Sequence, residues 1–231
     1  MIDFSLFEKQ IGVKFKDKGL LEQAFIHRSY INENSGNKIS HNERLEFLGD
    51  AVLELAVTDY LYRTYPNSDE GELTAYRSSL VNAIIIGEVA GELNMNEYLL
   101  LSKGESKDSG KARLYILANT YEAFVGALYM DQGYAPAEKF IRETLFGKLT
   151  EIVEKKLFRD AKSWIQEKCQ EHEGVTPSYK VLHENGPDHD KHFTIGIFFG
   201  NTRIAEGKGK SKQEAEQAAA RAALEAKNWL D

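Results

Sequence analysis

The stretch HNERLEFLGDAVLELAVTDYLYR, residues 41–63, decides the fold of the first half of this chain. Its apolar residues recur at steps of three and four, which predicts an amphipathic helix. At about 100° per residue, an arc of roughly 80° on this helix holds four acids and no base: Glu43, Glu46, Asp50 and Glu54. Like charges four residues apart cost a few tenths of a kcal/mol per pair, on the order of 0.3. A helix face that only needed hydration would mix in basic residues, so this arc requires another explanation.

Part of the pattern has a structural explanation. The S-x-x-E spacing of Ser40 and Glu43 predicts a capping box at the helix start, although it leaves Glu46 and Asp50 unexplained. We expect a core face on the opposite side of the helix, made of Leu45, Leu48, Val52 and Leu55. Phe47 projects among the acids instead, either as an unexceptional exposed side chain or as a contact for a partner protein.

The composition is that of an ordinary globular protein. The 231 residues are 42% hydrophobic and 28% charged, enough for one large domain or two small ones. No apolar run approaches the length of a membrane-spanning helix, and the N-terminal residues lack the pattern of a secretion signal, so we expect no membrane association. The single cysteine, Cys169, excludes internal disulfides and cysteine-based zinc sites and fits a reducing cytoplasm.

The charge is acidic throughout. The net charge is −7, and residues 1–158 carry 18 basic and 24 acidic residues against 11 and 12 in residues 159–231. Neither half is a basic arm of the kind that binds nucleic acid through charge alone. Any binding to phosphates must therefore come from local clusters or from metal ions.

The hydrophobic period changes near residue 158, which predicts two domains. Before it, helical spacing covers the ranges 17–26, 41–63, 72–95, 113–131 and 135–157. After it, a helix over "RDAKSWIQEKCQEH" is followed by alternating stretches typical of strands and by an Ala-rich helix. We predict an all-α domain over 1–155 and a small α+β domain, in the order α-β-β-β-α, over 159–231.

A second predicted helix, "ILANTYEAFVGALYMDQG", carries Asn119 and Glu122 on one face. Ala123 and Gly126 lie near that face and would let another helix approach closely. If the two helices meet there, Asn119 and Glu122 converge with Glu46 and Asp50. Clustered oxygens without a neutralising base suit a hard cation such as Mg²⁺ or Mn²⁺, and hence phosphoryl chemistry. A solvated acidic surface is the alternative that spacing alone leaves open.

These residues carry a resemblance to a known family. "HNERLEFLGDAVL" resembles the signature of ribonuclease III, a family of enzymes that cut double-stranded RNA. Further blocks resemble that family in the right order: "AFIHRSYINEN" (24–34), "DEGELTAYRSSLV" (69–81), "KGESKDSGK" (103–111) and "ILANTYEAFVGALYMDQGY" (116–134). The resemblance covers nearly the whole chain and implies an endonuclease domain followed by a double-stranded-RNA-binding domain.

The resemblance also implies roles for the acids. Glu46, Asp50 and Glu122 are expected to bind the catalytic Mg²⁺ ions, with Mn²⁺ as a substitute, and Glu43 and Glu70 to lie near the rim of the same valley. The expected reaction is two-metal hydrolysis of duplex RNA to 5′-phosphate and 3′-hydroxyl ends, in ribosomal and messenger RNA processing. No side-chain nucleophile is needed, and we interpret His27 as a structural residue outside the site.

Two positions depart from the family. Asn119 stands where an Asp is usual, which leaves three carboxylates in place of four in the expected ligand set. The site then binds metal more weakly, or the chain has become a duplex-RNA-binding protein with little or no cleavage. Tyr115 stands where the family commonly has Ser, and the sequence offers no physical account of it.

Cutting both antiparallel strands requires two sites related by a two-fold axis, which predicts a C2 homodimer. Phe47 resembles the family's dimer contact, and coverage by loops of its own chain is the alternative. The RNA-binding domain reads duplex shape through minor-groove hydroxyls and phosphates. Expected RNA contacts are Gln166 and Glu167 on its first helix, His189 in a loop, and Lys208, Lys210, Ser211 and Lys212 at the start of its last helix, where phosphate is favoured. Gln213, in place of a second base, predicts a weaker clamp, and Lys107, Lys111 and Arg113 of the first domain are additional candidates.

Overall fold

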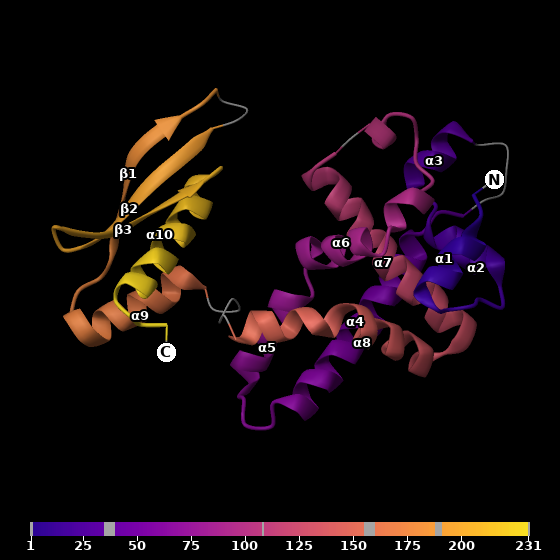
Figure 1. Ribbon diagram of the computed structural model, residues 1–231, viewed down its shortest axis with the longest axis horizontal. Helices are drawn as coiled ribbons and strands as arrows, with labels where there is room; N and C mark the ends of the chain where they lie inside the picture. The colour runs from indigo at the N-terminus through magenta and orange to yellow at the C-terminus, as the bar shows by residue number, and fades with distance from the viewer. Residues whose placement is uncertain (1, 35–39, 108, 155–159, 188–190, 231) are drawn as a thin grey trace. The chain divides into compact units, whose positions relative to one another are not determined.

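The computed structural model describes residues 2–34, 40–107, 109–154, 160–187 and 191–230. The chain divides into two compact units, Met1–Lys155 and Lys156–Asp231 (Figure 1). Each unit has its own core and is described by itself. None of the described helices is long and apolar enough to span a membrane.

The first unit is built from helices, as predicted. They are α1 (Phe4–Ile11), α2 (Lys18–Ala24), α3 (Arg28–Glu33), α4 (Glu43–Thr64), α5 (Glu70–Leu80), α6 (Ala83–Glu92), η1 (Met95–Tyr98), η2 (Glu105–Lys107), α7 (Lys111–Gln132) and α8 (Tyr134–Glu154). The helical pattern over residues 72–95 is divided between α5 and α6. The break falls at Asn82, whose side chain accepts hydrogen bonds from the amides of Ile84 and Ile85 and so caps α6.

The second unit has the predicted α-β-β-β-α order: α9 (Ala161–Glu173), β1 (Ser178–Asn185), β2 (His192–Phe199), β3 (Thr202–Gly209) and α10 (Lys212–Ala226). The three strands form one antiparallel sheet in the order β1-β2-β3. Trp164 of α9, Ile197 of β2 and Ala219 of α10 are buried in a common core. The two helices therefore cover one face of the sheet (Figure 1).

Helix α7 is the centre of the first unit, with α2, α4, α6 and α8 packed around it. Its Phe124 is fully buried and makes edge-to-face contacts with Phe7, Phe15 and Phe25. Such aromatic pairs contribute about 0.5–1.5 kcal/mol beyond their buried area. These aromatic contacts fix the rotation of α7 about its own axis and with it the direction in which its polar residues point.

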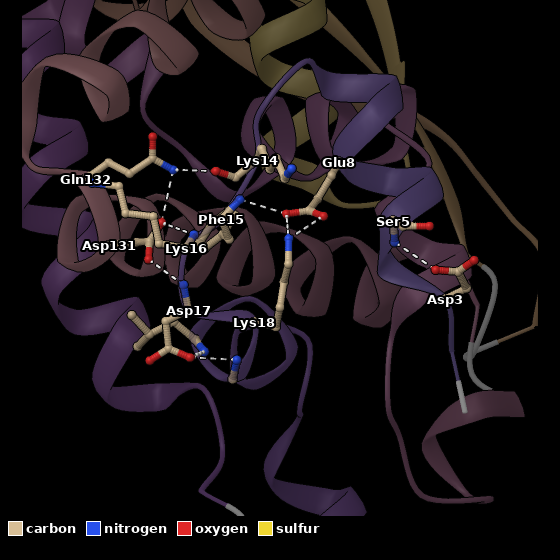
Figure 2. Close-up of polar contacts among 12 residues, drawn as sticks. Asp3, Ser5, Glu8, Lys14, Phe15, Lys16, Asp17, Lys18, Asp131 and Gln132 are labelled. Carbon is tan, nitrogen blue, oxygen red and sulfur yellow. Dashed lines mark hydrogen bonds and ion pairs between the residues drawn. The ribbon is translucent and has the colours of Figure 1, made fainter.

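The end of α7 is tied to the segment between α1 and α2 (Figure 2). The carboxylate of Asp131 accepts the backbone N–H groups of Lys16 and Asp17, both at 2.8 Å. On the other side of this segment, Glu8 is nearly buried, accepts the N–H of Phe15 at 2.7 Å and pairs with Lys18 at 2.6 Å. These contacts fix the position of α7 along its axis.

Helices α4 and α7 cross at two glycines. A Cβ placed on Gly49 would stand 1.7 Å from the carbonyl oxygen of Glu122, and one on Gly126 would stand 2.1 Å from that of Leu45. Only glycine allows the two backbones to come this close. The predicted close approach of another helix at Gly126 is therefore what the structure has, and α4 is that helix.

Two expectations about α4 are wrong. The capping box does not form, because Asn42 is the N-cap residue and Ser40 lies outside the helix. Asn42 is buried and donates its side-chain N–H to the carbonyl of Ala24, so the helix starts two residues later than a cap at Ser40 would require.

The core face is also displaced. Leu45 and Val52 are buried as expected and Leu48 is half-buried, but Leu55 is 57% exposed. Leu53, Ala56 and Val57 of the same helix are also buried. The reason is the approach at Gly49, which turns the buried side of α4 toward α7. The buried side thus adjoins the acids instead of lying opposite them.

Candidate functional site

The predicted acids of α4 and α7 meet beside the glycine crossing. Glu46 and Asp50 flank Gly49 on α4, and the backbone of Glu122 lies directly against that glycine. Glu46 and Glu122 are half-buried, whereas Asp50 is exposed. The closeness of the two backbones brings these carboxylates together.

Their charges act on one another. Burial, followed by the charges of Asp50 and Glu46, raises the pKa of Glu122 to about 7. Burial also raises the pKa of Glu46, followed by the charges of Glu43 and Asp50. Glu43, Glu46, Asp50 and Glu122 therefore form one electrostatic unit, below called the acidic cluster.

Glu43 stands at the rim of this cluster. It is the first residue of α4 and lies 3.6 Å from Nη1 of Arg28 and 3.7 Å from Nδ1 of His41. Its side chain is 48% exposed, so these pairs are screened by water and contribute little to stability. They compensate the outermost charge of the cluster, whereas among the described residues no base pairs with Glu46, Asp50 or Glu122.

Asn119 is half-buried on α7, one turn before Glu122 and on the same face. Among the described residues, no three His, Cys, Asp or Glu side chains already stand in a metal-ligating arrangement. The cluster thus has the donor chemistry for a hard cation, while its carboxylates would have to move toward one another to hold one.

Glu70 lies elsewhere in this chain. It begins α5 and lines a hollow of about 470 Å³ together with Thr58, Tyr62 and Arg77. Thr58 is two helical turns beyond Asp50, about 12 Å along the axis of α4. One chain therefore does not bring Glu70 into the acidic cluster.

The side of α4 beyond the acids is apolar and open. Phe47 is 80% exposed, so the alternative that its own chain covers it is wrong. Leu55, two turns further along, is exposed as well. Near the start of the helix, a hollow of about 490 Å³ is lined by Leu20, Leu45, Leu48 and Met130, among others.

His27 has a structural position, as interpreted from the sequence. It is the N-cap of α3, and its Nδ1 accepts the N–H of Ser29 and lies 2.8 Å from the hydroxyl of that residue. Burial lowers the pKa of its imidazole. Its backbone N–H donates to the carbonyl of Leu100, which joins two segments distant in sequence.

In the second unit, Gln166 and Glu167 are exposed on α9. They line an open hollow of about 570 Å³ with Ser163, Gln170 and Glu171. Ser163 and Gln170 were not among the predicted RNA contacts, although their spacing of three and four residues from the predicted pair places them on the same helix face. Hydroxyl and amide groups such as these can hydrogen-bond ribose hydroxyls.

At the start of α10, Lys208, Lys210 and Lys212 are all exposed. Ser211 is the N-cap, and its Oγ accepts the N–H of Glu214 at 3.1 Å. The Glu214 carboxylate in turn accepts the N–H of Lys210, the residue before the N-cap, at 2.9 Å, in an arrangement close to a capping box. Amides of the first turn remain available to an anion. His189 lies outside the described residues.

The three candidate bases of the first unit differ. Lys107 and Lys111 are exposed on either side of the turn that leads into α7. Arg113 donates from Nη2 to the carbonyls of Glu105 and Ser106, each at 3.0 Å, so its guanidinium organises that turn.

Comparison with known proteins matches both units. A family model described as "Ribonuclease-III-like" matches residues 17–149, and one described as "Double-stranded RNA binding motif" matches residues 161–227. The chain is 44% identical over 220 residues to Ribonuclease 3 of Pelotomaculum thermopropionicum, which covers 95% of this chain and 91% of that protein. It is also 44% identical to Ribonuclease 3 of Borreliella burgdorferi, covering 96% and 90% of the two chains.

Solved structures agree for the first unit. The nuclease domain of ribonuclease III from Campylobacter jejuni is similar with a TM-score of 0.57 and 34% identity, over 64% of this chain and 97% of that chain. A second structure of that domain, described as flexible in a region involved in dimer formation, has a TM-score of 0.55 and 35% identity over 62% of this chain and 98% of that chain.

Proposed function

This chain belongs to the ribonuclease III family of double-strand-specific endoribonucleases, and from this premise we propose how its acidic cluster acts on RNA. Four side chains would hold Mg²⁺, or Mn²⁺ in its place: Glu46, Asp50, Asn119 and Glu122. We take residues 1–155 as the nuclease domain and residues 159–231 as the double-stranded-RNA-binding domain.

The donor set fits a divalent cation. Three carboxylates and one amide supply oxygen atoms, which hard cations prefer. Burial, followed by the charges of Asp50 and Glu46, raises the pKa of Glu122, so its negative charge is unfavourable unless a dication neutralises it. This raised pKa, shared in direction by Glu46, is the observation that carries the proposal.

The residues of this chain have separate tasks in the reaction. Glu122 is on α7 and Asp50 is on α4, so the two helices together set the distance between these carboxylates. The close contact of Gly49 with the backbone of Glu122 fixes that distance. Glu43 receives compensation from Arg28 and stays at the rim. When bound, a pair of divalent ions would acidify a water molecule and stabilise charge on the leaving 3′ oxygen, which yields 5′-phosphate and 3′-hydroxyl ends.

A homodimer supplies the second site that a duplex needs. Phe47 is 80% exposed, and the apolar hollow beside Leu45 and Met130 is a place for the same side chain of a second copy. A C2 interface is self-complementary in this way. The similar domain from Campylobacter jejuni is described as having a region involved in dimer formation.

The second domain would hold the duplex by shape and charge. Gln166, Glu167 and their neighbours on α9 would face a minor groove, and the lysines around Ser211 would face phosphates. We propose that the protein processes ribosomal and messenger RNA precursors in the cytoplasm. The free thiol of the buried Cys169 fits a reducing compartment of this kind.

Replacing Glu122 by Gln tests the site. We expect cleavage of a labelled 30-base-pair duplex in Mg²⁺ to fall by more than about 100-fold, because even outer-sphere partners of metal ligands are worth about 10–100-fold. Duplex binding should stay close to wild type, since the second domain is untouched. Glu88→Gln, on the exposed side of α6, is the matched control and should cleave normally.

Cleavage by Glu122→Gln within a few-fold of wild type would contradict the assignment. A protein that binds duplexes without cutting them is the second candidate, favoured only by Asn119. It becomes the better description if the wild type fails to cleave at every Mg²⁺ and Mn²⁺ concentration while Asn119→Asp cleaves.

A further inference from the structure

The face of α7 that carries Glu122 continues for three turns toward the start of the helix. Lys111, Tyr115 and Asn119 precede Glu122 on it, all within an arc of roughly 80° at 100° per residue. Exposure grows along this strip, from half-buried Glu122 and Asn119 to Tyr115, which is 48% exposed, and to exposed Lys111. A path on the protein surface thus leads from the acidic cluster to an aromatic and a basic side chain.

Tyr115 has no structural task within the described residues: its ring stacks on no other aromatic ring, and its hydroxyl makes no hydrogen bond there. Tyr121, on the other side of the same helix, is the contrast. It is fully buried, and its hydroxyl lies 2.8 Å from that of Thr144. About half of the surface of Tyr115 is exposed, and its hydroxyl has no hydrogen-bond partner among the described residues, so the side chain can contact a ligand.

The backbone under Tyr115 is rigid. A Cβ placed on Gly87 of α6 would stand 2.5 Å from the carbonyl oxygen of Leu114, so α6 lies tightly against the residue before Tyr115. On the preceding turn, Arg113 holds the carbonyls of Glu105 and Ser106. Contact residues carried by fixed helices hold a substrate more accurately than those on loops.

We propose that Tyr115 is a positioning contact for the ribose-phosphate backbone of the strand being cut, a few nucleotides from the scissile phosphate. Tyrosine hydroxyls donate to phosphate and sugar oxygens, and the paired bases of a duplex leave no free base for its ring to stack on. Tyr115 lies about 10 Å along the helix from Glu122. Lys111, one turn further, adds a positive charge for the next phosphates. This inference rests on the proposed function, because it takes the acidic cluster to mark the cut.

Steady-state cleavage of a short duplex tests the contact with two variants, Tyr115→Phe and Tyr115→Ser. A hydrogen bond made equally in the ground state and the transition state affects KM alone. We expect KM to rise about 3- to 10-fold in both variants, with kcat within about two-fold of wild type. Leu6→Ser, which removes an exposed apolar side chain from α1, is the control and should leave both constants unchanged.

Modified duplexes identify the atom contacted. A single 2′-deoxy sugar or a single methylphosphonate is placed in turn at each position near the cut. At one position the modification should raise the KM of the wild type and leave the KM of Tyr115→Phe unchanged. A deoxy position with this behaviour identifies a ribose contact, and a methylphosphonate position identifies a phosphate contact.

A cross-link decides the proposal independently of cleavage. Replacing Tyr115 by the photoreactive p-benzoylphenylalanine, with Ca²⁺ in place of Mg²⁺, should give a cross-link to the duplex close to the cut, and the same replacement at Leu6 should give none. An unchanged KM in both variants, or no cross-link from position 115, overturns the proposal. If the wild type does not cleave at all, the proposed function fails, and the cross-link alone then decides whether Tyr115 contacts RNA.

Discussion

The acidic cluster between α4 and α7 and the lysines at the start of α10 are both proposed to act on a phosphate backbone, but their surroundings differ. The acids lie at a helix crossing so close that only glycine fits, and burial raises the pKa of two of them. The lysines are exposed on a helix start that is already capped by Ser211. Packing therefore governs the first region, and screened charge governs the second.

The difference has a mechanical consequence. Carboxylates that bind divalent cations attract them more strongly when they are partly buried, because Coulomb forces are stronger there. The same burial strengthens the repulsion between the carboxylates, so they need a rigid scaffold. Lysines that bind any duplex are better exposed, because each phosphate contact is then weak, additive and sensitive to salt. Changes in the first region should be abrupt, and changes in the second should be gradual.

Adding one methyl group at the crossing should produce the largest effect. In Gly49→Ala, the new Cβ meets a backbone carbonyl that cannot move aside. We expect a loss of more than about 3 kcal/mol in the free energy of unfolding, at or above the upper end for overpacked cores. Urea unfolding with and without the substitution measures it.

The matched control is Gly147→Ala in α8, where a Cβ would meet nothing within 4 Å. It should stabilise the protein by about 0.5–1 kcal/mol through helix propensity. Equal effects at the two glycines would contradict the crossing.

Removing the exposed bases should act gradually. Changing Lys208, Lys210 and Lys212 together to Ala should weaken binding to unrelated duplexes about equally. The log–log salt slope should flatten by up to about three units, one per lost phosphate contact. Filter binding at several salt concentrations measures the slope. Lys180→Ala, on β1, is the control, and a triple variant with an unchanged slope would show that the three lysines only solvate the helix start.

Asn119→Asp tests whether the acidic cluster extends along α7. The added charge should lower the Mg²⁺ concentration for half-maximal cleavage several-fold, an order-of-magnitude expectation because it depends on local dielectric. Asn and Asp have similar helix propensity, so the melting temperature without metal should change little. A Mg²⁺ titration of both proteins at one RNA concentration measures the shift. Coinciding curves would mean that residue 119 binds no metal.

The smallest expected effect is the pH dependence of stability without metal. The pKa of Glu122 is about 7 in the folded chain against an ordinary value of 4.5. The folded state therefore holds a proton that the unfolded state releases. Its stabilising contribution is complete below about pH 4.5 and is lost as the pH rises through 7.

Between pH 5 and pH 8 in EDTA, the melting temperature of the wild type should fall a few degrees more than that of Glu122→Gln. About 1 kcal/mol corresponds to about 2–4 °C in a chain of this size. Parallel curves for the two proteins would show that Glu122 titrates normally and that the cluster is not half-buried.

The sequence by itself determined which elements form and which residues bear chemistry. Periodicity alone separates a helical first domain from an α-β-β-β-α second domain, because spacing along the chain is a local property. The acids Glu43, Glu46 and Asp50, spaced along one helix face, and the pair Asn119 and Glu122 also stand in the sequence, as does Gly126 as a place of close approach.

Only the tertiary structure decided how those residues are used. Asn42 bonds to Ala24 and moves the start of α4 past Ser40, and Gly49 turns the buried side of α4 so that Leu55 faces water. The raised pKa of Glu122 depends on the same crossing. Each of these results depends on which segment packs against which, and the contacts join residues far apart in the chain, so local spacing carries no record of them.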